Sequence, residues 1–117
     1  MIHDCLRWED WKAAVAFGAR EVFHGEPLLE ALVLHLLFTR TRPKSHFGTG
    51  KNAGILKASA PDSPSSKPDL TKLVRAVEDS LTGIVWKDDA QVVEQWNRKE
   101  FGASPGVLVQ IFTIKNH

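Results

Sequence analysis

The sequence predicts a single α+β domain with two helices and a small mixed sheet, in the order helix, strand, long loop, helix, strand, strand. At 117 residues with 43% hydrophobic side chains, the chain has the size of one domain with a modest core. Two stretches carry apolar residues at helical spacing, and three others have the composition of strands. No internal repeat is visible, so residues 1–117 are expected to form one unit.

The first helix is expected over residues 6–23, because apolar side chains recur there three or four positions apart. The residues that share this spacing are Trp8, Trp11, Val15, Ala19 and Val22. His24, Gly25 and Pro27 follow, and they end the helix.

The segment LLEALVLHLLFTRTR, residues 28–42, is apolar at both odd and even positions and is bounded by prolines. This pattern is typical of a strand that is covered on both faces. Residues 43–68 are then rich in Gly, Ser, Pro and Lys, which predicts a long mobile loop. A loop of this length in a compact domain is more often functional or disordered than neutral.

The second helix is expected to begin at Asp69 and to end near Thr82, with Gly83 as a C-terminal cap. Its buried stripe comprises Leu70, Leu73, Val74, Val77 and Leu81. Thr71, Arg75 and Asp79 are four residues apart and line up on the opposite side. Two structural explanations compete with any function here: Asp69 is a favourable N-cap, and Arg75 with Asp79 makes an ordinary surface ion pair.

After Gly83 the pattern predicts two strands joined by GASPG, residues 102–106, as an antiparallel hairpin. Asp88 and Asp89 stand at the entry to the first of these strands. Adjacent strand residues point to opposite faces, so one carboxylate could face a site while the other holds the turn. The simpler explanation is a polar turn before a strand.

The formal net charge is only +1, but the charges are unevenly distributed. No acidic residue occurs between Glu30 and Asp62. The basic and imidazole side chains between them are His35, Arg40, Arg42, Lys44, His46, Lys51 and Lys57. The segment is either a solvated loop or a surface that receives a polyanion such as DNA.

Cys5 is the only cysteine, which excludes an internal disulfide and a zinc site with several cysteines. No apolar run reaches the roughly 18–20 residues that span a bilayer, because Glu30 and His35 interrupt the longest one. No signal peptide opens the sequence. These features predict a cytoplasmic protein.

The order and spacing of the acidic residues are more informative than any one of them. The pattern Asp69-Leu70-x-x-Leu73, then Arg75 and Asp79, then Trp86-x-Asp88-Asp89-x-x-Val92 resembles the signature of the RusA-type crossover junction endodeoxyribonucleases, the Holliday-junction resolvases. The neighbouring RPKSHFGTGKN and ILKASAPDSPSSKPDL are similar to the phage and actinobacterial branch of that family. The resemblance covers the chain from Trp8 to Lys115, and the spacing makes the set far more specific than any one acid.

The resemblance implies a small α+β homodimer that binds four-way DNA junctions and cuts two strands with Mg²⁺. Carried over by motif, Asp69 and Asp89 are catalytic metal ligands and Asp88 is a less certain ligand. Arg75 is the third catalytic residue, which contacts the phosphate or steadies the leaving group. The DNA-binding residues expected are Arg40, Arg42, Lys44, Lys51, Lys57 and Lys72.

Two departures from the family accompany this resemblance. The best-known pattern reads Asp-Leu-Asp-Asn-Leu, whereas Thr71 and Lys72 stand here at the third and fourth positions. Thr71 could still hold a metal-bound water, and Asp79 could add charge behind the ligands. The family also begins with a strand before its first helix, so the chain is expected to be short at its N-terminus and to leave an unpaired strand edge.

Two other functions fit the same residues. A catalytically impaired relative would keep the basic surface and bind junctions without cutting them, as Thr71 and the short N-terminus suggest. A generic protein-binding α+β domain would use its acids only to cap and turn the chain.

Overall fold

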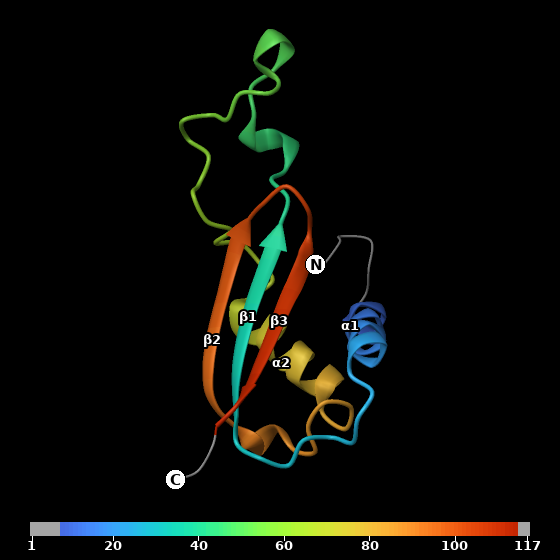
Figure 1. Ribbon diagram of the computed structural model, residues 1–117. Helices are drawn as coiled ribbons and strands as arrows, with labels where there is room; N and C mark the ends of the chain where they lie inside the picture. Colours follow the sequence, from blue (N-terminus) through green and yellow to red (C-terminus); the bar gives the residue numbers. More distant parts are fainter. Residues whose placement is uncertain (1–7, 115–117) are drawn as a thin grey trace.

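The computed structural model describes residues 8–114 and confirms the α+β fold and the order of its elements. Two helices lie on one face of a three-stranded mixed sheet (Figure 1). The elements are α1 (Trp8–Val22), β1 (Leu32–Arg40), α2 (Leu70–Leu81), β2 (Val92–Phe101) and β3 (Gly106–Thr113). Within these described residues, neither helix has the length and hydropathy needed to cross a membrane.

The core lies between the helices and the inner face of β1. Every second residue of β1 is buried there, namely Leu32, Leu34, Leu36 and Phe38. The expected stripe of α2 packs against them and is confirmed, although Leu70 is only partly buried. Trp11 and Trp86 complete the core, and each large apolar side chain buried there contributes roughly 1.5–3 kcal/mol.

The first helix is confirmed, but its apolar face is only partly buried. Trp11 is buried, whereas Val22 is 81% exposed and Phe23, just beyond the helix, packs on the core instead. An apolar cavity of about 620 Å³ lies between α1 and the inner side of β3. Val22 lines this cavity. It stays exposed because α1 lies over the β3 edge of the sheet and not over its centre (Figure 1).

The predicted hairpin is wrong. β2 and β3 run in opposite directions, but β1 lies between them, parallel to β2 and antiparallel to β3. The chain from Gly102 to Pro105 crosses the end of β1, and the Gly102 amide donates to the Arg40 carbonyl at 2.9 Å. A Cβ on Gly102 would lie 2.6 Å from the Thr39 methyl, so any other residue here would have to displace the Thr39 side chain.

Because β1 is central, the two edges of the sheet within residues 8–114 are β2 and β3. The expectation that both faces of β1 are covered is not met within residues 8–114. Its outer face carries Val33, His35, Leu37 and Thr39, which are only partly buried. Exposed apolar neighbours on the same outer face are Trp96, Leu108 and Phe112.

Residues 41–68, called the arm below, extend beyond the end of the sheet (Figure 1). The molecule measures 58 × 31 × 21 Å, and the arm lies at one end of the longest dimension. Two short 3₁₀ turns, Lys44–His46 and Gly50–Asn52, punctuate it. The predicted loop is therefore present and takes a defined path away from the body.

Candidate active site and nucleic-acid interface

Asp69 occupies the N-cap position of α2, as expected, but its carboxylate makes no capping hydrogen bond. The side chain is exposed, and the segment before it is held by two cations. Lys99 Nζ on β2 donates to the carbonyls of Ser66 and Pro68, both at 3.0 Å. Arg40 Nη1 donates to the Lys67 carbonyl at 2.8 Å. The backbone is thus fixed while the carboxylate stays available, which argues against a purely structural Asp69.

Asp88 and Asp89 have different surroundings although they are neighbours. Asp88 caps the 3₁₀ turn Asp89–Gln91: its Oδ1 accepts from the Ala90 amide at 2.9 Å, and Gln91 Oε1 accepts from the Asp88 amide at 2.8 Å. Gln91 also donates to two backbone carbonyls in the segment before β1. Asp88 is therefore a cap, as the simpler explanation held, whereas Asp89 is exposed and its carboxylate takes no part in the cap.

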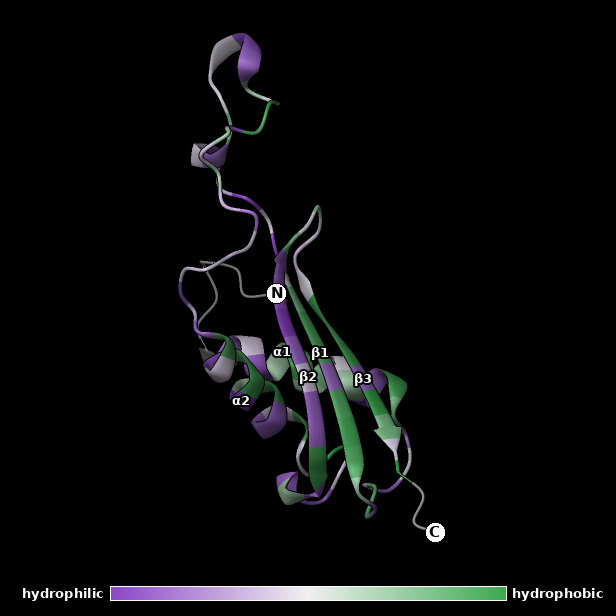
Figure 2. Ribbon diagram, turned by 90° about the vertical axis from the view of Figure 1, so that its left-hand side faces the viewer, coloured by the Kyte–Doolittle hydropathy of each residue, from purple (hydrophilic) through white to green (hydrophobic). Residues whose placement is uncertain are grey.

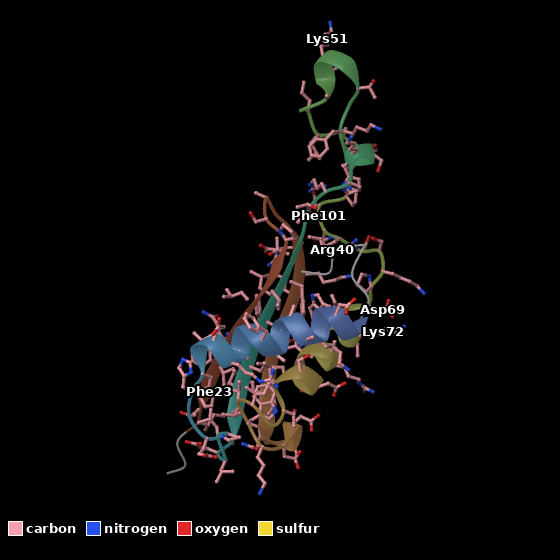
Figure 3. All side chains as sticks on the ribbon, turned by 90° about the vertical axis from the view of Figure 1, so that its right-hand side faces the viewer. Phe23, Arg40, Lys51, Asp69, Lys72 and Phe101 are labelled. Atoms are coloured by element: carbon pink, nitrogen blue, oxygen red, sulfur yellow. The ribbon has the colours of Figure 1, made fainter. Side chains whose placement is uncertain are left out.

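The two expected metal ligands lie toward opposite ends of α2. Asp69 precedes the helix on the side of the arm (Figure 3), and the 3₁₀ turn that contains Asp89 precedes β2 at the far end of the sheet (Figure 1). Asp89 lies close enough to Glu78 for its charge to raise the pKa of Glu78. Asp69 and Glu78 are nine positions apart, which corresponds to a rise of about 13 Å along a helix.

A shared Mg²⁺ ion needs its oxygen ligands about 2.1 Å away. The carboxylates of Asp69 and Asp89 fit such an ion in kind, because each is an uncommitted oxygen donor. Their positions in one chain do not bring them to the same ion. Among residues 8–114, no three His, Cys, Asp or Glu side chains form a group that could hold a metal.

Glu78 is a titratable residue of this region that sequence reasoning missed. Partial burial raises its pKa, and the nearby charges of Asp89 and Asp79 raise it further. A hydrogen bond from Gln95 Nε2 to Glu78 Oε2 at 2.8 Å acts in the other direction. The neighbouring Asp79 is visible in the sequence, but burial, Asp89 and Gln95 act on Glu78 only once β2 and the turn before it are in place.

The row on the outer side of α2 is solvent-exposed, as expected from its spacing. Thr71 and Arg75 are exposed, and Asp79 lies 3.9 Å from Lys12 Nζ of α1. The structure gives no Arg75–Asp79 ion pair among the described residues, so that expectation is wrong. Lys72 lies beside Asp69 at the start of the helix (Figure 3).

The basic side chains expected to contact DNA fall into two groups. Arg40 and Arg42 lie at the base of the arm and donate hydrogen bonds to its carbonyls, Arg42 Nη1 to that of Pro61 at 2.7 Å. The Arg42 guanidinium also stacks 4.2 Å from the centre of the Phe101 ring, which His46 contacts edge-on. Lys44, Lys51 and Lys57 are exposed along the arm.

Fold and site together define a small α+β protein with a cationic arm, an uncommitted Asp69 carboxylate at the base of that arm and an exposed Asp89 at the far end of the sheet. A family model described as Endodeoxyribonuclease RusA matches residues 3–112. The chain therefore belongs to the RusA endodeoxyribonuclease family, as the ordered motif predicted.

One curated relative is a bacterial protein without an assigned role. The "Uncharacterized protein YqaN" of Bacillus subtilis (strain 168) is 40% identical to this chain over 48 residues. The match covers 41% of this chain and 34% of YqaN, so the chain aligns with about a third of that protein.

Proposed function

We propose that the protein is an endodeoxyribonuclease that cleaves branched DNA, with four-way junctions as its substrate, in the cytoplasm. Membership of the RusA family supports this proposal. The observation that carries it is the Asp69 carboxylate, which caps nothing and lies beside Lys72 at the base of a cationic arm. A phosphodiester bound along the arm would therefore meet an uncommitted acid.

Mg²⁺ is the proposed cofactor, with Asp69 and Asp89 as the residues that would hold it. In such sites the ion polarises a phosphoryl oxygen and lowers the pKa of a bound water. Arg75 is exposed on α2 between the two acids and is proposed to bind a phosphate oxygen.

A homodimer is proposed because the outer face of the sheet is apolar and uncovered in the described residues. Trp96 and Phe112 flank His35 on this face, with ring centres 5.9 and 5.1 Å from its imidazole. Leu37 and Leu108 lie opposite each other on neighbouring strands. A two-fold dimer also suits the two-fold symmetry of a four-way junction.

A junction-binding protein without efficient cleavage is the second candidate, favoured by Thr71. This residue is exposed near the start of α2, where an aspartate would add a second carboxylate close to Asp69. A labelled four-way junction incubated with the protein in Mg²⁺ or in EDTA separates the candidates. Cleavage in Mg²⁺ alone supports the nuclease, and binding in both buffers without cleavage supports the second candidate. Absence of both cleavage and binding would refute both candidates.

A further inference from the structure

We propose that the arm recognises the branch point of DNA, with Ile55 and Leu56 contacting unstacked bases while Lys51 and Lys57 bind the adjacent phosphates. This rests on the proposed DNA substrate and extends it, because it names the part of the substrate that is read and the residues that read it. None of these four residues belongs to the acidic site.

The outer half of the arm is a narrow two-stranded finger. Phe47 pairs with Leu56 in an antiparallel bridge, and the Gly48 amide donates to the Ile55 carbonyl at 3.0 Å. A Cβ on Gly48 would lie 2.7 Å from Asn52 Cβ and 2.8 Å from its carbonyl oxygen, so Gly48 approaches the 3₁₀ turn at the tip too closely for any other residue. The finger therefore presents its side chains from a defined backbone.

The base of the arm fixes the direction of the finger. Arg40 and Arg42, at the end of β1 and just beyond it, bind carbonyls of the returning chain at Lys67 and Pro61. Phe101, at the end of β2, packs under the Arg42 guanidinium. The contacts join both sides of the arm to the sheet, so a DNA molecule held by the finger has a set position relative to Asp69 (Figure 3).

The finger combines apolar and cationic side chains. Ile55 is 60% exposed and Leu56 is 44% exposed, and a hydrophobic stretch is visible near the outer end of the arm (Figure 2). Lys51 lies at the tip (Figure 3), Lys57 follows Leu56, and no acidic residue occurs between Glu30 and Asp62. Neighbouring cations without acids favour a polyanionic partner over an ordinary protein surface.

The apolar pair specifies what kind of DNA is bound. Intact duplex hides the faces of its bases in the stack, so it offers the finger only phosphates and groove edges. Apolar side chains that enter DNA contact base faces where stacking is interrupted. A branch point supplies such an interruption without the cost of unstacking a duplex, so Ile55 and Leu56 are expected to increase affinity for junctions and not for duplexes.

The test uses the full chain carrying Ile55→Ser and Leu56→Ser together, with Leu29→Ser as the matched control. Leu29 is also an exposed apolar residue, 73% exposed, but it lies in the segment before β1 and away from the arm. Binding is measured in EDTA by fluorescence anisotropy to a four-way junction and to a duplex of equal length. A second junction carries 2-aminopurine at the branch point, where its fluorescence reports loss of stacking.

The wild type and Leu29→Ser are expected to prefer the junction and to raise 2-aminopurine fluorescence. The double variant is expected to lose at least tenfold in junction affinity and to lose the fluorescence change, with duplex affinity within twofold and an unchanged Tm. Lys51→Ala with Lys57→Ala should instead weaken both DNA forms and flatten the log–log salt dependence by about 0.9 per lost contact. Junction preference and fluorescence retained by the double variant would overturn the role of the arm, whereas a wild type without junction preference would overturn the proposed function itself.

Discussion

The body and the arm are held together by different forces. The body, made of the two helices and the sheet, relies on buried apolar side chains such as Leu34, Val77 and Trp86. The arm buries almost no apolar side chain and relies on hydrogen bonds from Arg40 and Arg42 to its carbonyls. This difference predicts that stability depends on the body, whereas DNA contact can be changed in the arm without unfolding the protein.

The largest expected effect is in the core. Trp86 has no exposed surface, and its Nε1 donates to Thr82 Oγ1 at 3.0 Å. Trp86→Ala should lower the free energy of unfolding by about 3–5 kcal/mol, because it leaves a cavity and removes the hydrogen bond to Thr82 Oγ1. Urea unfolding measures this change, with the exposed neighbour Lys87→Ala as a control that stays within about 0.5 kcal/mol. A loss below about 1 kcal/mol for Trp86→Ala would show that the core is not centred here.

The acids of the body test whether function can be removed without loss of stability. Asp69→Asn and Asp89→Asn should each reduce cleavage at least 100-fold while Tm does not fall and junction affinity stays unchanged, since neither carboxylate caps or ties the fold. Asp88→Asn should keep most of the cleavage. Its cost should be at most about 0.5–2 kcal/mol in stability, because it alters a cap. Cleavage at wild-type rate by both Asp69→Asn and Asp89→Asn would refute the site.

Mixing the two inactive variants sharpens this test. If each active site takes Asp69 from one chain and Asp89 from the other, a mixed dimer contains one intact site and nicks the junction. If both acids of a site come from the same chain, the mixed dimer has none. The proposed dimer surface is the outer face of the sheet, whereas α2 packs on the inner face, so this dimer keeps the acids of the two chains apart and mixing should not restore nicking. Nicking by the mixture, with subunit exchange shown by differently tagged chains, would contradict this prediction.

The outer face of the sheet is the apolar part of the body that no described residue covers. Leu108→Lys places a charge on this face, opposite Leu37, and should weaken self-association at least tenfold while the monomer stays folded. Sedimentation equilibrium measures the change. Ala103→Lys, in the exposed crossing between β2 and β3, is the matched control. Equal self-association of both variants would exclude this face as the dimer interface.

Sequence reasoning succeeded where the signal is local. The helical spacing in α2 predicted its buried stripe, and the Thr82–Gly83 stop is confirmed by the positive φ of 91° at Gly83. The strand order could not be predicted, because GASPG is a plausible hairpin turn and nothing nearby reveals that β1 lies between β2 and β3. Parallel pairing of β1 with β2 joins residues about sixty positions apart.

The site shows the same limit. The positions of Asp69 and Asp88 as caps follow from local rules, but only the fold shows that one carboxylate is uncommitted and the other is used. The basic run correctly marked the arm, yet Arg40 and Arg42 could not be separated from the lysines by composition. Their partners are carbonyls of Lys67 and Pro61, and those contacts exist only after the arm has turned back.

The smallest expected effect concerns Glu78. This residue lies in the body, but its contribution to stability depends on its charge and not on apolar burial. Its pKa is raised by burial first and then by Asp89 and Asp79, against the opposing effects of Gln95 and Arg75. The folded chain therefore binds the Glu78 proton more tightly than the unfolded chain does. Stability falls as pH rises through the interval between the unfolded and the folded pKa, and the charged carboxylate opposes folding above it.

Glu78→Gln removes that charge and keeps an oxygen that can accept from Gln95, so Tm should rise by a few degrees at most at pH 7. The gain should vanish near about pH 3.5, where Glu78 is protonated in the folded and in the unfolded chain. Calorimetry across this range measures both values, and Glu94→Gln, on the exposed start of β2, serves as the control for loss of one negative charge. A gain that is equal at both pH values would mean that packing, rather than the charge of Glu78 beside Asp89, limits stability at this end of α2.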